Sequence, residues 1–182
     1  MILDHTTLAT PIGPVALYAD GAELVGLEFA DALDRRTTLE RSLRRHLGAF
    51  TLRGSADPAG AGSRLRRYFA GELAALAEQP VRPHGTPFQL EVWSALRTIA
   101  PGTTWTYAAL AARIGRPEAR RAVGAANGAN PIALFVPCHR VIASDHTLWG
   151  YGGGLERKRW LLVHEGAPFA DRFAQESLAL PR

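Results

Sequence analysis

The only cysteine of this 182-residue chain, Cys138, lies directly before a histidine in the segment Pro137-Cys-His-Arg-Val141. A single cysteine cannot form an internal disulfide, and one thiolate is too few for a cysteine-rich zinc site. A cysteine reacts as a thiolate, which requires a base or a positive charge nearby, and His139 is such a base. Adjacency alone is weak evidence, because a buried cysteine is more often a small apolar core residue. Other residues must decide between the two interpretations.

Three further polar side chains could take part in chemistry, and each also has an ordinary structural explanation. Tyr107 begins an expected helix, where a tyrosine is usually an amphipathic core residue. Asn130 precedes a proline, which is typical of a turn. Glu165 lies near the end of another expected helix, where carboxylates are usually solvated. Taken singly, none of them indicates an active site.

The composition is that of a globular protein, with 21% charged and 47% hydrophobic residues. No uninterrupted apolar stretch approaches the roughly 20 residues of a membrane helix, and the N-terminus shows no signal peptide. We therefore expect no membrane partner, and the single cysteine favours a reducing, cytoplasmic location. The formal charge of +4 permits a polyanionic partner without establishing one.

The N-terminal half alternates between strand and helix patterns. Residues 5–10, 15–20, 24–29 and 49–52 favour strands, and Asp20-Gly21 is a hairpin signal. Residues 32–47 have helical spacing, and Ser63 is a plausible N-cap for a helix that carries Leu65, Tyr68 and Phe69. This order predicts an α/β domain with a small antiparallel sheet plus helices.

From Thr86 onward the chain is predicted to be mainly helical. Thr86 can cap a helix with Pro87 at its first position. Helices over 106–114 and 118–127, joined by a short Gly-containing turn, indicate a helix-turn-helix. The prolines at 80 and 83 mark the boundary. The predicted organisation is a supporting domain, a linker, a DNA-binding and catalytic domain and a C-terminal tail, at residues 1–80, 81–85, 86–170 and 171–182.

The second helix of this pair carries a stripe of small residues. Ala122, Ala125, Ala126 and Ala129 recur at helical spacing, with Gly124 among them. Such a stripe allows a close approach, either to another helix or to nucleic acid. Arg120 and Arg121 add positive charge at the N-terminal end of the helix. Tight helix packing and a nucleic-acid surface remain equally compatible with this pattern.

Together these segments closely resemble the O6-alkylguanine-DNA alkyltransferase family over residues 84 to about 168, and Pro-Cys-His-Arg in this setting is highly specific. The N-terminal half resembles the family only in length and in its strand-then-helix order. The matching residues are Thr86-Pro-Phe-Gln89, Val92-Trp93, Thr106-Tyr107, Arg121-Ala-Val-Gly124, Asn130-Pro131, Pro137-Cys-His-Arg-Val141, Gly150-Tyr151, Gly153-Gly154 and Leu161 to Gly166.

The resemblance implies a ribonuclease-H-like N-terminal domain and a winged-helix-like C-terminal domain that binds double-stranded DNA through the minor groove. It implies irreversible, single-turnover transfer of an alkyl group, mainly methyl, from O6 of guanine to Cys138, with O4 of thymine as a further substrate. The damaged base must be flipped out of the duplex, because stacking and pairing shield it. No cofactor is implied, and a monomer is expected.

The resemblance also implies a role for each matching residue. His139 acts as base through a water, Glu165 orients it, and Tyr107 hydrogen-bonds guanine N3 and crowds the phosphate. Arg121 fills the space that the flipped base leaves, and Asn130 ties the recognition helix to the active-site segment. The DNA-binding face comprises Arg121, Tyr107, Ala122, Gly124, Ala125 and Asn127. The substrate pocket comprises Val141, Trp149, Tyr151 and Gly152.

The segment 142–149 departs from the family pattern. Trp149 adjoins the glycine loop, and we expect it either to narrow the pocket in favour of methyl groups or to pack away from it. His146 is expected to be a turn residue rather than a second base. Because the single cysteine is assigned to chemistry, the sequence does not support the zinc sites that some family members carry, and no metal is predicted.

Two other functions are compatible with parts of the pattern. A lesion-binding sensor or regulator would bind alkylated DNA without transfer, but relatives of that type replace the cysteine. A Cys-His hydrolase would need a third polar residue, for which only Glu165 is available, and it would leave the helix-turn-helix unexplained.

Overall fold

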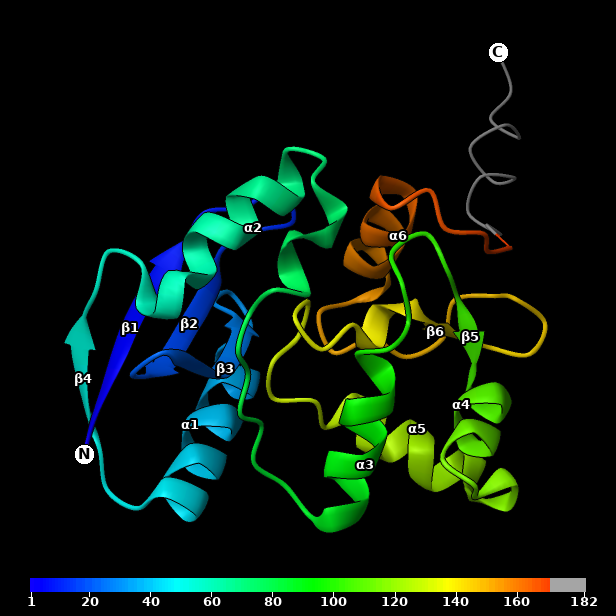
Figure 1. Cartoon of the computed structure of the whole chain (residues 1–182), viewed down its shortest axis with the longest axis horizontal. Coiled ribbons are helices and arrows are strands. Elements are labelled where there is room, and N and C mark those ends of the chain that lie inside the picture. Colours follow the sequence, from blue (N-terminus) through cyan, green and yellow to red (C-terminus); the bar gives the residue numbers. More distant parts are fainter. Residues whose placement is uncertain (171–182) are drawn as a thin grey trace.

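The N-terminal region is a four-stranded sheet in the computed structural model, which describes residues 1–170 (Figure 1). The strand order is β3-β2-β1-β4, where the strands are β1 (Ile2–Leu8), β2 (Val15–Asp20), β3 (Glu23–Phe29) and β4 (Thr51–Gly54). The first three strands are antiparallel, as predicted, and β2 turns into β3 at Asp20-Gly21. However, β4 pairs with β1 in parallel, so the sheet is mixed. A helical connection between β3 and β4 makes this parallel pairing possible.

Two helices cover opposite faces of this sheet (Figure 1). Helix α1 (Leu33–Leu47) packs Leu39 and Leu43 on one face, and α2 (Ala61–Phe69) packs Leu65 and Tyr68 on the other. The helix α2 begins at Ala61, so the expected N-cap at Ser63 is wrong. Instead the Asp57 carboxylate accepts hydrogen bonds from the backbone N–H groups of Gly62 and Ser63. Short 3-10 turns η1 (Pro58–Gly60) and η2 (Leu73–Leu76) flank this helix.

The C-terminal region is mainly helical, which confirms the predicted fold class. It contains α3 (Pro87–Leu96), α4 (Tyr107–Arg113), η3 (Pro117–Ala119), α5 (Arg120–Gly128), η4 (Cys138–Arg140) and α6 (Leu155–His164), with the parallel pair β5 (Trp105–Thr106) and β6 (Val141–Ile142). Thr86 caps α3 as predicted, and the cap is reciprocal: the backbone N–H of Gln89 donates to Thr86 Oγ1 and the N–H of Thr86 donates to Gln89 Oε1.

The two regions share one hydrophobic core. Leu17 and Leu65 of the N-terminal region belong to the same buried cluster as Val92, Val123 and Phe135 of the C-terminal region. The expected linker, residues 81–85, lies along β3: the N–H of Arg82 donates to the carbonyl of Leu24. The division into domains remains a prediction, and the expected tail at 171–182 lies outside the described residues.

Candidate active site

Cys138 begins the short turn η4 at the end of a fully buried apolar segment. Residues 132–137 have at most 8% exposure, and Cys138 itself is 6% exposed. Asn130 holds this segment in place, because its Nδ2 donates to the Val136 carbonyl at 2.7 Å and its Oδ1 accepts from the Ile132 N–H at 3.0 Å. Asn130 follows directly after α5, so it connects this helix to the cysteine segment, as its expected role requires.

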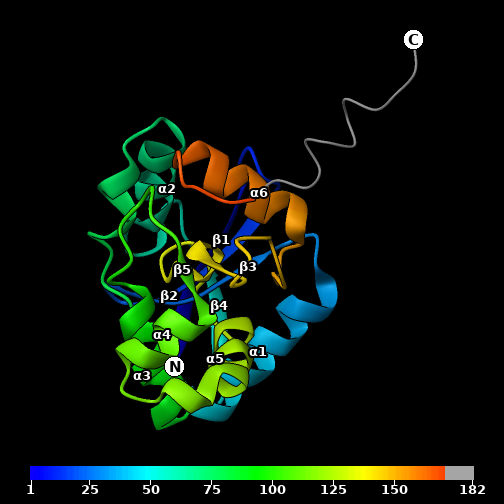
Figure 2. The same ribbon diagram turned by 90° about the vertical axis from the view of Figure 1, so that its right-hand side faces the viewer.

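Cys138, His139 and Glu165 come from two elements that meet in the core. His139 lies in η4 and Glu165 caps the C-terminal end of α6, which packs against η4 (Figure 2). Nε2 of His139 lies 3.0 Å from Oε1 of Glu165, and both side chains are fully buried. Because a carboxylate only accepts hydrogen bonds, Nε2 carries the proton in the neutral ring. Nδ1 then keeps its lone pair, and it has no hydrogen-bond partner among the described residues.

The electrostatics of this group keep Cys138 and His139 neutral at rest. Burial raises the pKa of the Cys138 thiol, although Asn130 and Lys158 oppose the shift. Burial also lowers the pKa of His139, and the Glu165 carboxylate only partly offsets this. For Glu165 burial acts to raise the pKa, but hydrogen bonds from His139 and Arg140 and the charge of Arg140 outweigh it and hold the pKa well below its usual value. A neutral imidazole beside a neutral thiol is a base ready to accept a proton.

Two further groups fix Glu165. Arg140 forms a two-pronged ion pair with it, through Nε to Oε2 and Nη2 to Oε1, each at 2.8 Å. This agrees with the expected structural role of Arg140. The hydroxyl of Tyr68, on α2 of the N-terminal region, donates to Oε1 at 2.8 Å. The sequence analysis treated Tyr68 only as a helix core residue, and no sequence signal linked it to Glu165, 97 positions away.

Lys158 is a second residue that the sequence analysis missed. It is fully buried, and its Nζ donates to the carbonyls of Val141 and Trp149, both at 2.7 Å. Burial lowers its pKa to about 8. The ammonium group thus holds together the two ends of the loop that connects β6 to the glycine segment, which its position on α6 alone did not indicate.

A small cavity of about 20 Å³ opens beside Cys138. Tyr151 and Gly152 line it as expected, and Glu28 and Arg35 of the N-terminal region were not anticipated there. Val141 is buried and does not line it. Trp149 is 68% exposed and does not line it either, so the expectation that Trp149 narrows the pocket is wrong. The remaining lining residues include Asn127, Gly128, Asn130, Gly150 and Gly153.

The small-residue stripe of α5 divides between surface and core. Arg121, Ala122 and Ala125 are exposed, whereas Ala126 is buried and its carbonyl accepts from Trp93 Nε1 at 2.8 Å. Asn127, expected on the DNA-binding face, is instead only 4% exposed, and its Nδ2 lies 3.4 Å from the Cys138 carbonyl oxygen. The stripe therefore serves both helix packing and an exposed surface.

Tyr107 lies where α4, α5 and the cysteine segment meet. A Cβ built on Gly124 would lie 3.9 Å from the tyrosine ring, which is ordinary van der Waals contact. Burial raises the pKa of Tyr107, the charge of Cys138 adds to this, and Asn127 opposes it. Its hydroxyl therefore stays protonated and can donate a hydrogen bond.

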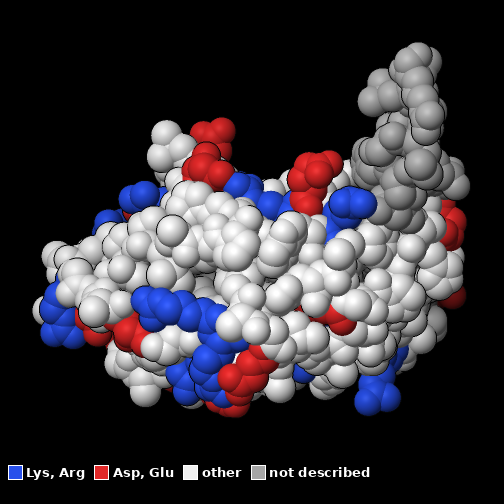
Figure 3. All heavy atoms as spheres, turned by 90° about the horizontal axis from the view of Figure 1, so that it is seen from above, with Lys and Arg blue, Asp and Glu red and all other residues white. Residues whose placement is uncertain are grey.

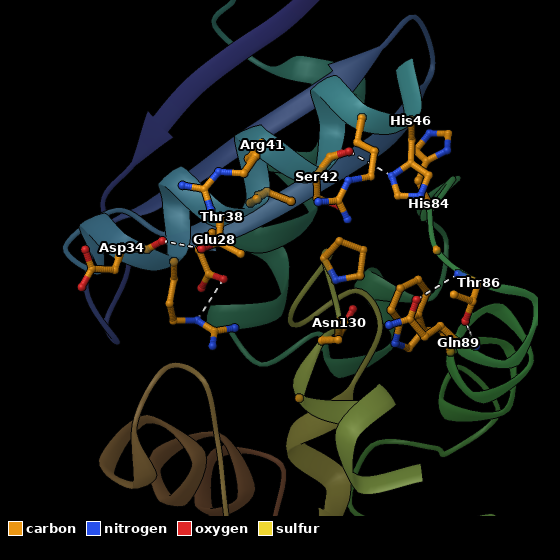
Figure 4. Close-up of a pocket in the computed structure, with 18 residues that line it drawn as sticks. Glu28, Asp34, Thr38, Arg41, Ser42, His46, His84, Thr86, Gln89 and Asn130 are labelled. Carbon is orange, nitrogen blue, oxygen red and sulfur yellow. Dashed lines mark hydrogen bonds and ion pairs between the residues drawn. The ribbon is translucent and has the colours of Figure 1, made fainter. Parts of the chain in front are cut away.

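A much larger groove, about 680 Å³, lies between α1 and the C-terminal region (Figure 4). Figure 4 shows Arg41 and Ser42 on one side and Thr86 and Gln89 on the other, with Asn130 between them and His46 and His84 next to each other at one end. Glu28, Arg35, Gly128 and Asn130 line both this groove and the small cavity. Because the two hollows share these four residues, they are neighbours.

No group of three or more His, Cys, Asp or Glu side chains within residues 1–170 is arranged to hold a metal ion. Within the same range no helix has the length and apolar character needed to cross a membrane. His146 lies in an exposed turn with φ +62°, as expected for a turn residue.

Comparisons with known proteins agree with this geometry. Residues 87–167 match the family described as "6-O-methylguanine DNA methyltransferase, DNA binding domain". The chain is 48% identical over 160 residues to the methylated-DNA–protein-cysteine methyltransferase of Salmonella typhimurium, covering 87% of this chain and 93% of the relative.

Two solved structures are similar to almost the whole chain. The Mycobacterium tuberculosis O6-methylguanine methyltransferase has a TM-score of 0.73 at 39% identity, covering 96% of this chain and 99% of its own. The structure of M. tuberculosis OGT in complex with DNA has a TM-score of 0.73 at 41% sequence identity. The match covers 92% of this chain and 96% of that chain. Since the similarity extends through the sheet as well as the helical region, the chain belongs to the methylated-DNA–protein-cysteine methyltransferase family.

Proposed function

We propose that this chain repairs O6-methylguanine in DNA by transferring the methyl group directly to Cys138. Family membership supports the reaction, a methyl transfer from DNA to the protein's own cysteine. The observation that supports Cys138 as the acceptor is the buried sequence of groups Cys138–His139–Glu165. The sensor alternative is disfavoured because the cysteine is present and is supplied with a base.

In this mechanism the Cys138 proton passes through a bridging water to Nδ1 of His139. The thiolate sulfur then attacks the methyl carbon, the S–C bond forms, and the bond between that carbon and guanine O6 breaks. The electron pair stays on the guanine, which Tyr107 stabilises by donating a hydrogen bond from its hydroxyl to N3. Glu165 stabilises the positive charge that His139 gains. The thioether product is stable, so each molecule reacts once. O4-methylthymine is a further expected substrate, because it presents the same alkyl–oxygen bond.

We propose that double-stranded DNA is bound through its minor groove by the exposed side of α5. Ala122 and Ala125 are short enough for the narrow groove, and Arg121, at the start of the helix, is exposed and forms no ion pair within residues 1–170. By contrast, acidic and basic side chains are intermingled on the face formed by α2 and α6 (Figure 3). There Arg67 is paired with Glu72 and Glu78, which suits solvent rather than a polyanion.

Base flipping follows from the burial of the cysteine. Cys138 is only 6% exposed, so a guanine stacked in a duplex cannot reach its sulfur. The nucleotide must rotate into the small cavity while Arg121 takes its place in the stack. We further propose that the protein acts as a monomer in the cytoplasm, where its single cysteine stays reduced.

The test is to incubate the protein with a duplex that carries one radiolabelled O6-methylguanine. We expect one label per protein molecule, located by mass spectrometry on Cys138, and DNA binding without label for Cys138→Ala. Binding without label in the unaltered protein would support the sensor instead. Repeated turnover on an ester or amide would support the hydrolase.

A further inference from the structure

Tyr68 connects the N-terminal region to the groups around Cys138. It is fully buried on α2, outside the part of the chain that matches the DNA-binding family domain, residues 87–167. Its hydroxyl donates to Oε1 of Glu165 at 2.8 Å, and its backbone carbonyl lies 2.9 Å from Nε2 of His164. The tyrosine and His164 rings also pack edge to face, with centroids 5.0 Å apart. Tyr68 is therefore held at both its ring and its backbone against the end of α6.

The Tyr68 hydroxyl shares one oxygen of Glu165 with His139. Oε1 accepts from Tyr68 at 2.8 Å, from Arg140 Nη2 at 2.8 Å and from His139 Nε2 at 3.0 Å. Each donor interacts with the same negative charge, so a donor added at Oε1 weakens the electrostatic attraction of the carboxylate for the His139 imidazole. The Tyr68 phenol is a strong, neutral hydrogen-bond donor, so it weakens this attraction without adding a buried cation.

The charge that His139 experiences decides whether it can act as a base. Glu165 and Cys138 are the anionic or potentially anionic groups nearby, and Arg140 and Lys158 are the cationic ones. An unmoderated Glu165 would favour the imidazolium, which has no lone pair for the cysteine proton. The Tyr68 hydroxyl keeps its own proton, because burial raises its pKa and the Glu165 charge raises it further. Tyr68 therefore remains a donor across the working pH range.

We propose that Tyr68 is a positioning residue for the methyl transfer: its hydroxyl fixes Glu165 and limits the negative charge that Glu165 presents, so that His139 stays neutral and able to accept the Cys138 proton. The proposal deepens the proposed function and rests on it. It also gives the N-terminal region a direct part in the chemistry. That part is absent from the helical region alone, because the hydroxyl comes from α2.

The experiment compares single-turnover methyl transfer by wild type and Tyr68→Phe between pH 5 and 9. The variant loses only the hydroxyl, so we expect the acid limb of the rate profile to move up by about 0.5 to 1 pH unit. On this limb the variant should transfer the methyl group about three to ten times more slowly than wild type. At higher pH the two transfer rates should agree within about twofold. The DNA dissociation constant should not change, because Tyr68 is fully buried and lies on α2 rather than on α5.

The matched control is Tyr18→Phe. Tyr18 is also fully buried and its hydroxyl also donates to a glutamate, Glu40 at 2.7 Å, but on the opposite face of the sheet. This variant should leave the profile unchanged. In a Glu165→Gln background, Tyr68→Phe should cause no further shift. Identical profiles for wild type and Tyr68→Phe would overturn the proposal, as would a uniform loss of rate at every pH.

A second measurement does not depend on transfer. NMR titration of the histidine rings in DNA-free protein reports the protonation of His139 directly, and it should show His139 protonating at higher pH in Tyr68→Phe than in wild type. No difference there would also refute the role of Tyr68. If wild type transfers no methyl group at all, the proposed function fails, whereas the titration still tests the effect of Tyr68 on His139.

Discussion

The two hollows of this molecule differ in volume and in the side chains that line them. The groove along α1 encloses about 680 Å³ and the cavity beside Cys138 about 20 Å³, although they share four lining residues. In the groove, Arg41 and Arg45 form no ion pair with any described residue, and Ser42 and Thr38 lie on α1. The small cavity is lined by the buried thiol of Cys138, and the next residue, His139, is buried and paired with the buried carboxylate of Glu165.

This difference indicates that reactivity at Cys138 depends on the exclusion of water and not on the volume of the cavity. A carboxylate in the core acts strongly on its neighbours because little solvent screens it, whereas charges along the open groove are screened. The small cavity beside Cys138 has about the volume of a single water molecule. A guanine is far larger, so the glycine segment and Arg35 must move apart when it enters. Arg35 lies against Gly152, where an added Cβ would meet its guanidinium at 2.2 Å.

The largest effect is expected from Glu165→Ala, which removes the carboxylate behind the small cavity. Arg140 would then be a buried cation without its partner, which costs roughly 3 to 5 kcal/mol of unfolding free energy. Urea unfolding at pH 7 measures this. Because the pKa of Glu165 is lowered by folding, its contribution is present at neutral pH and declines as the pH falls below 4.5, the ordinary value. The difference in unfolding free energy between wild type and Glu165→Ala should therefore become smaller below pH 4.5.

The control for this variant is Glu72→Ala, which breaks an exposed ion pair with Arg67. Exposed pairs contribute little, so its unfolding free energy should stay within about 1 kcal/mol of wild type. Equal losses in the two variants would contradict the distinction between buried and screened charges.

A smaller effect is expected from Arg121→Ala on the exposed side of α5. Loss of the residue that replaces the flipped base should slow transfer from duplex DNA by about tenfold, equivalent to about 1.4 kcal/mol. Transfer from a single-stranded oligonucleotide should change little, because no stacked position needs filling. The matched control is Arg66→Ala, which removes an exposed arginine from α2. An unchanged duplex rate for Arg121→Ala would remove Arg121 from its proposed position.

The smallest effect is expected in the large groove. The double variant Arg41→Gln with Arg45→Gln should keep the transfer rate within about twofold, since neither residue lines the cavity beside Cys138. The slope of log K for DNA against log salt should also be unchanged. A slope reduced by about 0.9 for each arginine would instead place DNA phosphates in the groove. That result would show that the groove, too, belongs to the DNA interface.

Local sequence signals predicted those elements whose cause is local. Thr86-Pro87 has both a capping side chain and a proline suited to the first turn, and α3 begins there. The Asp20-Gly21 turn joins β2 to β3 as expected, because glycine supplies the positive φ, here +58°. The cap at Ser63 failed because Asp57, six residues earlier, bonds the same backbone groups from outside the helix.

The sequence missed the site residues that distant elements supply. Tyr68 on α2, Glu28 at the end of β3 and Arg35 on α1 reach the site only because α1 and α2 pack on opposite faces of the sheet, whose strand β3 bridges to the segment before Cys138. Trp149 illustrates the reverse error: it is next to the glycine segment in sequence, yet its side chain turns outward and is 68% exposed. Asn127 was likewise placed on the DNA-binding face by the family resemblance, and packing placed it inside.

The sequence by itself determined the reacting atoms: one sulfur, the histidine after it, and the family in which that pair is found. Those follow from residue types and spacing along a single segment, where neighbours in the chain are neighbours in space. Only the tertiary structure decided how those atoms are tuned, because burial, the charge on Glu165 and the donors that surround it come from side chains up to 97 positions apart. Such contacts depend on which faces pack together, and no local pattern records that.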